Sequence, residues 1–176
     1  LTRPELEWVN ALLPSSKFIL AVRDPVARLW SQFNMDLRRA VKSDQTDAWK
    51  DGRGGDVMRG LASVSRLQEF LQRPDVLSRS FPSKTYEVWR DVIGSERLLL
   101  VYFDDIVKQP STVERAILTF LGLDPESGHT VPTGNRKSNR PKTPIESEFR
   151  EVLVAFFESE LHRCAELFHP AGKEWL

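Results

Sequence analysis

KFILAVRDPVARLWSQ, which spans residues 17–32, places a strand signal directly before a helix signal. Residues 18–22 are apolar at every position, and such a run predicts a parallel strand that is covered on both faces. After Arg23, Asp24 is suited to cap a helix and Pro25 suits its first turn. A strand that ends in an arginine and turns at once into a helix favours an anion, because helix N-termini attract negative charge.

The helix that follows is predicted to run to about residue 41, with its apolar side chains at helical spacing. These side chains belong to Val26, Leu29, Trp30, Phe33 and Leu37. A second apolar run at residues 98–103 (LLLVYF) predicts another buried strand, closed by Asp104 and Asp105. Further helices are predicted over residues 4–13, 57–71, 82–93, 111–122 and 145–168.

Several of these helices carry end signals. Gly94 and Gly122 are predicted stops, and Ser111 to Glu114 (STVE) match a capping box. The last helix is predicted to bury a stripe formed by Phe149, Val152, Leu153, Phe156, Cys164 and Leu167. Residues 42–56 and 124–144 are polar and rich in glycine or proline, so both are predicted to be mobile surface loops.

The order of these elements indicates the fold class. Helices that alternate with all-apolar strands predict a three-layer α/β/α arrangement around a parallel sheet, as one domain over residues 1–176. Two strands are too few for such a sheet. We therefore expect part of the sheet to be missing from these elements.

Composition excludes several classes of partner. The 176 residues have a formal net charge of zero, which gives no general argument for nucleic acid or for an anionic membrane. The single Cys164 excludes an internal disulfide and a cysteine-rich metal site. No apolar run is long enough to span a membrane, and the first residues do not resemble a signal peptide. A cytoplasmic location is favoured, and a lumenal domain with an upstream anchor stays open.

Arg23 and Ser31 are the first candidates for a binding site. Arg23 is predicted at the carboxyl end of the strand, where open α/β sheets bind ligands, and its planar fork suits phosphate. A salt bridge with Asp24 or another nearby carboxylate is an equal alternative. Ser31 lies about two turns into the helix and off its apolar face, so it either points at the same anion or faces water.

Weaker candidates concern metals and carboxylates. His129, His162 and His169 share no ligand spacing, so no metal site is expected. Asp104 and Asp105 are predicted to form a turn or a helix cap and are not expected to act in catalysis.

The segment Lys-apolar strand-Arg-Asp-Pro-Val-x-Arg-x-x-Ser resembles the 3′-phosphate-binding segment of sulfotransferases that use 3′-phosphoadenosine 5′-phosphosulfate. The resemblance continues at LLLVYFDDI (residues 98–106), at the helix ending in Phe120-Leu121-Gly122-Leu123, and at Gly172 and Trp175. It implies a P-loop-like sulfotransferase fold. It also implies a 3′-phosphate site formed by Arg23, Ser31 and a basic loop that contains Arg136, Lys137 and Ser138.

Two departures from that family stand out. Ser80-Phe81-Pro82 replaces the family's usual Gly-x-Tyr, so Phe81 either stacks on the purine or belongs to the core. The family's phosphosulfate-binding loop, similar to Lys-x-Gly-Thr-Thr-Ser, is not found, since Gly52 to Gly55 follow no strand. This loop and the usual catalytic base are therefore expected upstream of residue 1, and no catalytic residue is predicted in this chain.

The resemblance implies transfer of a sulfuryl group from 3′-phosphoadenosine 5′-phosphosulfate to a hydroxyl or amine of a small-molecule or glycan acceptor, without a metal. The product would be 3′,5′-adenosine bisphosphate. Two alternatives stay open: a non-catalytic nucleotide-binding or interaction module that retains the 3′-phosphate site, and a P-loop kinase relative. The acceptor and the oligomeric state do not follow from the sequence.

Overall fold

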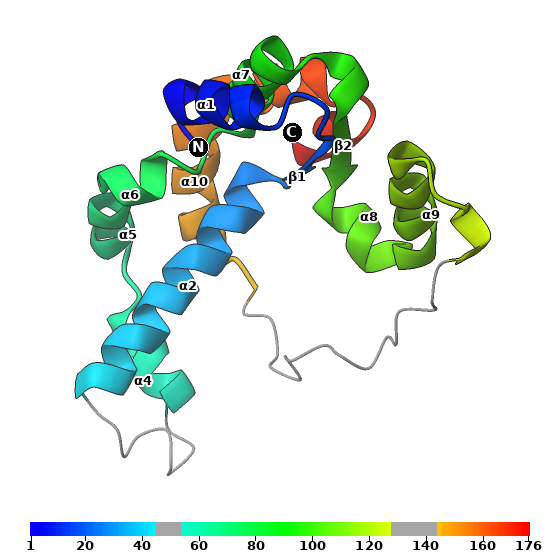
Figure 1. The fold of residues 1–176 in the computed structure, drawn as a ribbon. Helices are drawn as coiled ribbons and strands as arrows, with labels where there is room; N and C mark the ends of the chain where they lie inside the picture. The colour runs from blue at the N-terminus through cyan, green and yellow to red at the C-terminus, as the bar shows by residue number, and fades with distance from the viewer. Residues whose placement is uncertain (45–53, 128–143) are drawn as a thin grey trace. The chain divides into compact units, whose positions relative to one another are not determined.

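The computed structural model describes residues 1–44, 54–127 and 144–176 (Figure 1). The chain divides into two compact units. The sheet unit comprises Leu1–Arg23 and Pro82–Pro141, and the helical unit comprises Asp24–Phe81 and Lys142–Leu176. The prediction of one domain over residues 1–176 stays a prediction.

The sheet unit is built on two parallel strands, β1 (Phe18–Val22) and β2 (Leu98–Tyr102). Phe18 pairs with Leu98 at one end of the register and Val22 pairs with Tyr102 at the other. Around the strands lie helices α1 (Arg3–Leu12), α7 (Pro82–Ile93), α8 (Phe103–Lys108) and α9 (Pro110–Leu121), with short 3-10 turns η1 (Ser95–Arg97) and η2 (Pro125–Ser127).

The core of the sheet unit lies between its strands and the helices α1 and α7, which pack side by side (Figure 1). Leu6, Ile93 and Leu98 are buried at its centre. The rings of Phe18 and Trp89 form a T-shaped pair with centroids 6.2 Å apart. The strand at residues 18–22 is confirmed, but the prediction that both its faces are covered is wrong. Side chains alternate along a strand, and those of Ile19 (40% exposed) and Ala21 point away from this core.

Arg97 joins the segments that enter the two strands. Its guanidinium donates hydrogen bonds to the carbonyl of Pro14 (2.6 Å), to Oδ1 of Asn10 (2.7 Å) and to the carbonyl of Ile93 (2.9 Å). Asn10 in turn donates to the carbonyl of Val92 at 3.0 Å. These bonds satisfy carbonyls that lie outside regular ladders, so Arg97 has a structural role that the sequence did not reveal.

The helical unit contains α2 (Pro25–Asp44), α4 (Gly54–Leu61), α5 (Val64–Leu71), α6 (Pro74–Leu77), α10 (Ser147–Leu167) and the 3-10 turn η4 (Ala171–Trp175). The predicted stripe on α2 is confirmed, because Val26, Leu29, Trp30, Phe33 and Leu37 are all buried. Aromatic contacts join α2 to its neighbours. The ring centroids of Trp30 and Phe149 of α10 are 5.2 Å apart, and those of Phe33 and Phe70 of α5 are 5.4 Å apart.

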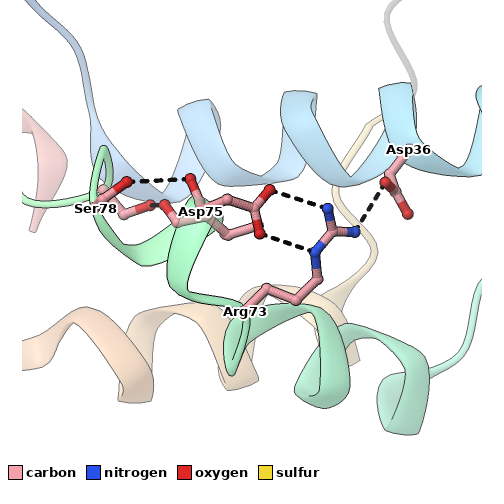
Figure 2. Close-up of polar contacts among 6 residues, drawn as sticks. Asp36, Arg73, Asp75 and Ser78 are labelled. Atoms are coloured by element: carbon pink, nitrogen blue, oxygen red, sulfur yellow. Dashed lines mark hydrogen bonds and ion pairs between the residues drawn. The ribbon is translucent and has the colours of Figure 1, made fainter.

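The exposed Arg73 links α6 to α2 through ion pairs (Figure 2). Arg73 donates from Nε and Nη2 to both carboxylate oxygens of Asp75, at 3.2 and 3.0 Å, and from Nη1 to Asp36 at 3.1 Å. The hydrogen bonds from Arg73 hold the pKa of Asp75 below its ordinary value. Because these groups face water, the contact orients the helices more than it stabilises them.

Two predicted elements have different bounds. The helix predicted over residues 57–71 is two helices, α4 and α5, because Ser63 caps the second one by accepting a hydrogen bond from the backbone N–H of Arg66 at 3.2 Å. The loop predicted at 42–56 is shorter, since residues 42–44 belong to α2 and 54–56 to α4, while 45–53 lie outside the described residues. Of the loop at 124–144, residues 128–143 lie outside the described residues.

Three local predictions are wrong. Phe103 begins α8 and does not extend the strand, because Asp104 and Asp105 are favourable in the first turn of a helix. The capping box at Ser111 does not form, since α9 already begins at Pro110, where a missing N–H is tolerated. In α10 the side chain of Phe157 is fully buried and that of Phe156 is 41% exposed, because the stripe continues at intervals of four residues from Phe149.

Candidate anion site

The two strands end at the same edge of the sheet, and the register decides which residues follow there. Val22 pairs with Tyr102, so Arg23 and Phe103 are the residues that directly follow the two strands. In open α/β sheets ligands bind outside the carboxyl ends of parallel strands. Arg23 and Phe103 therefore lie together at the edge where a ligand is expected.

Arg23 stacks on Phe103. Its guanidinium carbon lies 4.5 Å from the centroid of the Phe103 ring, and both side chains are partly accessible. Within the described residues Arg23 forms no ion pair, so the predicted alternative of a salt bridge is not found there. Asp24 accepts a hydrogen bond from the backbone N–H of Val26 at 2.8 Å and thereby caps α2, as predicted.

The stacked arrangement keeps the hydrogen-bonding capacity of Arg23 available. A guanidinium carries five N–H donors, and a phenyl ring attracts its charge without offering an oxygen or nitrogen acceptor. A carboxylate partner would instead occupy the donors. Within the described residues, Arg23 is therefore a cation whose N–H donors are not occupied by a carboxylate.

The other predicted site residues are placed separately or not at all. Ser31 is exposed on α2 and belongs to the helical unit, whereas Arg23 belongs to the sheet unit. Arg136, Lys137 and Ser138 lie outside the described residues, as does His129. Phe81 packs edge-on against Phe157 of α10, with ring centroids 5.8 Å apart, which favours the core alternative for this residue.

A profile of the sulfotransferase family matches residues 4–127, well over half of the chain. The matched region includes both strands, Arg23 and Ser31. This chain belongs to the sulfotransferase family. The sequence resemblance to sulfotransferases is thereby confirmed.

A solved structure shows the same fold. The crystal structure of a sulfotransferase from Alicyclobacillus acidocaldarius matches 98% of this chain, with a TM-score of 0.63 and 20% sequence identity. The predicted α/β fold of the sulfotransferase type, with parallel strands, is confirmed. The chain spans 62% of the length of that bacterial sulfotransferase chain. The search of curated proteins found no match to the present chain.

Sequence reasoning missed Phe103 as a partner of Arg23 in this sulfotransferase chain. The two residues are far apart in the sequence, and only the pairing of β1 with β2 brings them together. The second arginine of the motif, Arg28, differs from Arg23 because it donates to the hydroxyl of Ser80 at 3.3 Å. Ser80 is fully buried and donates to the carbonyl of Val76 at 2.6 Å, so Arg28 forms part of the packing of the helical unit.

Tyr102, the last residue of β2, has an altered titration. Burial raises the pKa of Tyr102 above its ordinary value, and the nearby Tyr86 and Asp105 raise this pKa further. Asp104 and Asp105 lie in the first turn of α8, and Asp105 accepts a hydrogen bond from Gln109 at 3.1 Å, which fits the predicted structural role. Neutral Tyr102 thus contributes to the stability of the sheet unit.

This pKa shift predicts a stability change at alkaline pH. Because the folded-state pKa of Tyr102 is raised, its contribution is fully present below the ordinary tyrosine pKa of about 10 and is lost as pH rises through the folded pKa. The chain has two tyrosines, so a Tyr86→Phe variant isolates Tyr102 in an ultraviolet titration of tyrosinate. We expect a midpoint above that of a tyrosine peptide, and an equal midpoint would contradict the burial argument.

Other features of the described residues do not extend the site. They contain no group of three or more histidine, cysteine or carboxylate side chains that could hold a metal. A shallow hollow of about 480 Å³ lies along α10 beside Leu176, and a cavity of about 70 Å³ lies between α2, α4 and α10 near Asn34. Each is lined by the helical unit alone. None of the helices in the described ranges is both long and apolar enough to cross a membrane.

Proposed function

We propose that this chain binds 3′-phosphoadenosine 5′-phosphosulfate through its 3′-phosphate and serves sulfuryl transfer to a hydroxyl or amine acceptor. The observation that carries the proposal is the guanidinium of Arg23 at the carboxyl edge of the strands, which forms no ion pair within the described residues. Membership in the sulfotransferase family supports the same assignment, because the matched region contains this edge. The acceptor is proposed to be a small molecule or a glycan.

The roles of the proposed site residues are binding and orientation. Arg23 offers two parallel N–H bonds that fit two oxygens of a phosphate. Ser31 adds a hydroxyl from α2, and Arg136, Lys137 and Ser138 add charge and donors from a basic loop. We assign no catalytic residue within the 176 residues.

The chemistry that this binding would serve is an in-line displacement. The acceptor oxygen or nitrogen forms a bond to sulfur while the bond from sulfur to the 5′-phosphate oxygen breaks, the phosphate keeps the electron pair, and the acceptor proton passes to a base that we do not assign. The contribution of Arg23 is to fix the position of the nucleotide, which lowers the entropic cost of aligning the reacting groups.

Calorimetry with three nucleotides tests the proposal. The 176-residue chain is titrated with 3′,5′-adenosine bisphosphate, 5′-AMP and ATP, and we expect the bisphosphate to bind most tightly because it alone carries a 3′-phosphate. Tight binding of ATP together with indifference to the 3′-phosphate would overturn the proposal and favour a kinase relative.

A transfer assay separates the enzyme from the non-catalytic alternative. The full-length protein that contains this chain is incubated with radiolabelled sulfate donor and a broad panel of alcohols, amines and glycans. Labelled acceptor would support a sulfotransferase activity. Tight bisphosphate binding without any transfer would instead favour a nucleotide-binding module that retains the 3′-phosphate site.

A further inference from the structure

Phe103 is a partly exposed apolar residue directly after the end of β2. Its side chain is 37% exposed, although it follows a strand whose side chains Leu98 and Val101 are buried. Its described contact with a charged group is the stack against Arg23, at 4.5 Å. The exposure and the contact together indicate a role at the surface of the sheet edge.

The contact with Phe103 restricts the side-chain rotamers of Arg23 without occupying its hydrogen-bond donors. A free arginine side chain samples many rotamers, and fixing it on a ligand costs conformational entropy. A ring packed against the guanidinium limits those rotamers in advance and provides no oxygen or nitrogen acceptor for its five N–H donors. An ion pair would limit them equally but would consume the donors and cancel the charge.

The paired strand ends hold both members of the stack in place. Val22 and Tyr102 are opposite each other in the ladder, and the backbone of each continues directly into Arg23 and Phe103. Phe103 is also the first residue of α8, so its backbone is fixed by the helix as well as by the strand. The ring therefore stands on rigid backbone and not on a loop.

We propose that Phe103 is a positioning residue, which holds the guanidinium of Arg23 ready to accept the 3′-phosphate of the nucleotide. The proposal rests on the proposed function, since it assigns to Arg23 the role described there. Phe103 acts through Arg23 and does not itself contact the ligand.

A double-mutant cycle on the 176-residue chain tests this role. Binding of 3′,5′-adenosine bisphosphate and of 5′-AMP is measured by calorimetry for the wild type, Phe103→Leu, Arg23→Ala and the double variant. We expect Phe103→Leu to weaken bisphosphate binding about two- to fivefold, the factor that corresponds to a cation–π contact of about 0.5–1 kcal/mol. Binding of 5′-AMP should not change, and Phe103→Leu should have no further effect once Arg23 is alanine.

Two further variants separate positioning from general damage. Phe103→Tyr retains an aromatic face and should bind the bisphosphate with wild-type affinity. Phe120→Leu removes the ring that lies 5.2 Å from the ammonium of Lys17, beside the other end of β1, and should leave bisphosphate affinity unchanged. A loss in Phe120→Leu equal to that in Phe103→Leu would overturn the inference.

The outcomes distinguish this inference from the proposed function. If the wild type does not prefer the bisphosphate to 5′-AMP, the proposed function fails and the inference fails with it. If the wild type shows the preference and Phe103→Leu keeps it in full, only the inference is overturned. A loss that is equal for both nucleotides, or that persists in the Arg23→Ala background, would show that Phe103 contacts the ligand directly and would also overturn it.

Discussion

Replacing Arg23 with alanine is expected to weaken binding of 3′,5′-adenosine bisphosphate by about 1.5–3 kcal/mol, or roughly 10- to 150-fold. The magnitude is that of hydrogen bonds to a charged group, and within the described residues Arg23 packs on Phe103 and forms no ion pair that would occupy its donors. Ser31→Ala should cost less, since a neutral hydroxyl supplies one donor where Arg23 supplies a charged pair. Calorimetry on each purified variant gives the affinities.

Arg90→Ala is the matched control for this substitution. Arg90 also belongs to the sheet unit and also stacks on a ring, with its guanidinium carbon 5.4 Å from the centroid of Tyr86, but it lies in the last turn of α7. Its loss removes the same charge and a similar contact, and bisphosphate affinity should stay unchanged. Equal losses in Arg23→Ala and Arg90→Ala would show a general charge effect and would remove the assignment of Arg23.

Arg23→Lys tests the geometry of the contact. Lysine keeps the charge but offers a point-like ammonium in place of a planar fork, so we expect it to recover only part of the affinity. Full recovery would mean that charge alone attracts the nucleotide. Binding of 5′-AMP should change little in either variant, because this nucleotide lacks the phosphate that Arg23 is proposed to hold.

The strands and Arg23 could be predicted from the sequence because the signals are local. Five consecutive apolar residues define β1, Gly94 and Gly122 end their helices with positive φ angles of 85° and 80°, and Arg23 stands directly after the strand. The partner of Arg23 could not be predicted in the same way. Phe103 continues an apolar run that predicts a strand, and only the register of β1 with β2 reveals that it meets Arg23.

Tertiary packing also decides the features that sequence patterns described wrongly. An apolar run does not reveal whether a second layer covers the strand, and Ile19 is exposed within a run that predicts burial on both faces. Periodicity over residues 57–71 continues across two helices because it cannot detect the cap that Ser63 provides. The grouping of Arg23 with Ser31 and with Arg136 to Ser138 stays a prediction, which the binding measurements address.

Gly172→Ala is expected to lower the free energy of unfolding by about 3 kcal/mol, at the upper end of the usual cost of overpacking. Gly172 is buried in η4, and a Cβ atom added there would lie 2.1 Å from the carbonyl oxygen of Cys164 and 2.6 Å from its carbonyl carbon. Both are backbone atoms of α10, so neither can rotate away as a flexible side chain would. Urea denaturation of the wild type and the variant measures the difference.

The expected damage follows from what η4 does for the helical unit. The backbone N–H of Gly172 donates to the carbonyl of Phe168 at 2.7 Å, and the buried ring of Trp175 packs against Phe168 at 5.9 Å. Moving Gly172 away from α10 would strain both its hydrogen bond to Phe168 and the ring contact of Trp175 with Phe168. A change at Trp175 would affect only the ring contact.

Gly60→Ala is the matched control, because it makes the same chemical change in the same unit with the opposite expected sign. Gly60 lies in α4, and an added Cβ there would meet nothing within 4 Å. Alanine should stabilise this position by roughly 0.5–1 kcal/mol, since it has the higher helix propensity. If Gly172→Ala proved as harmless as Gly60→Ala, the close approach of η4 to α10 would not exist in solution, and the packing argument for the end of the helical unit would be wrong.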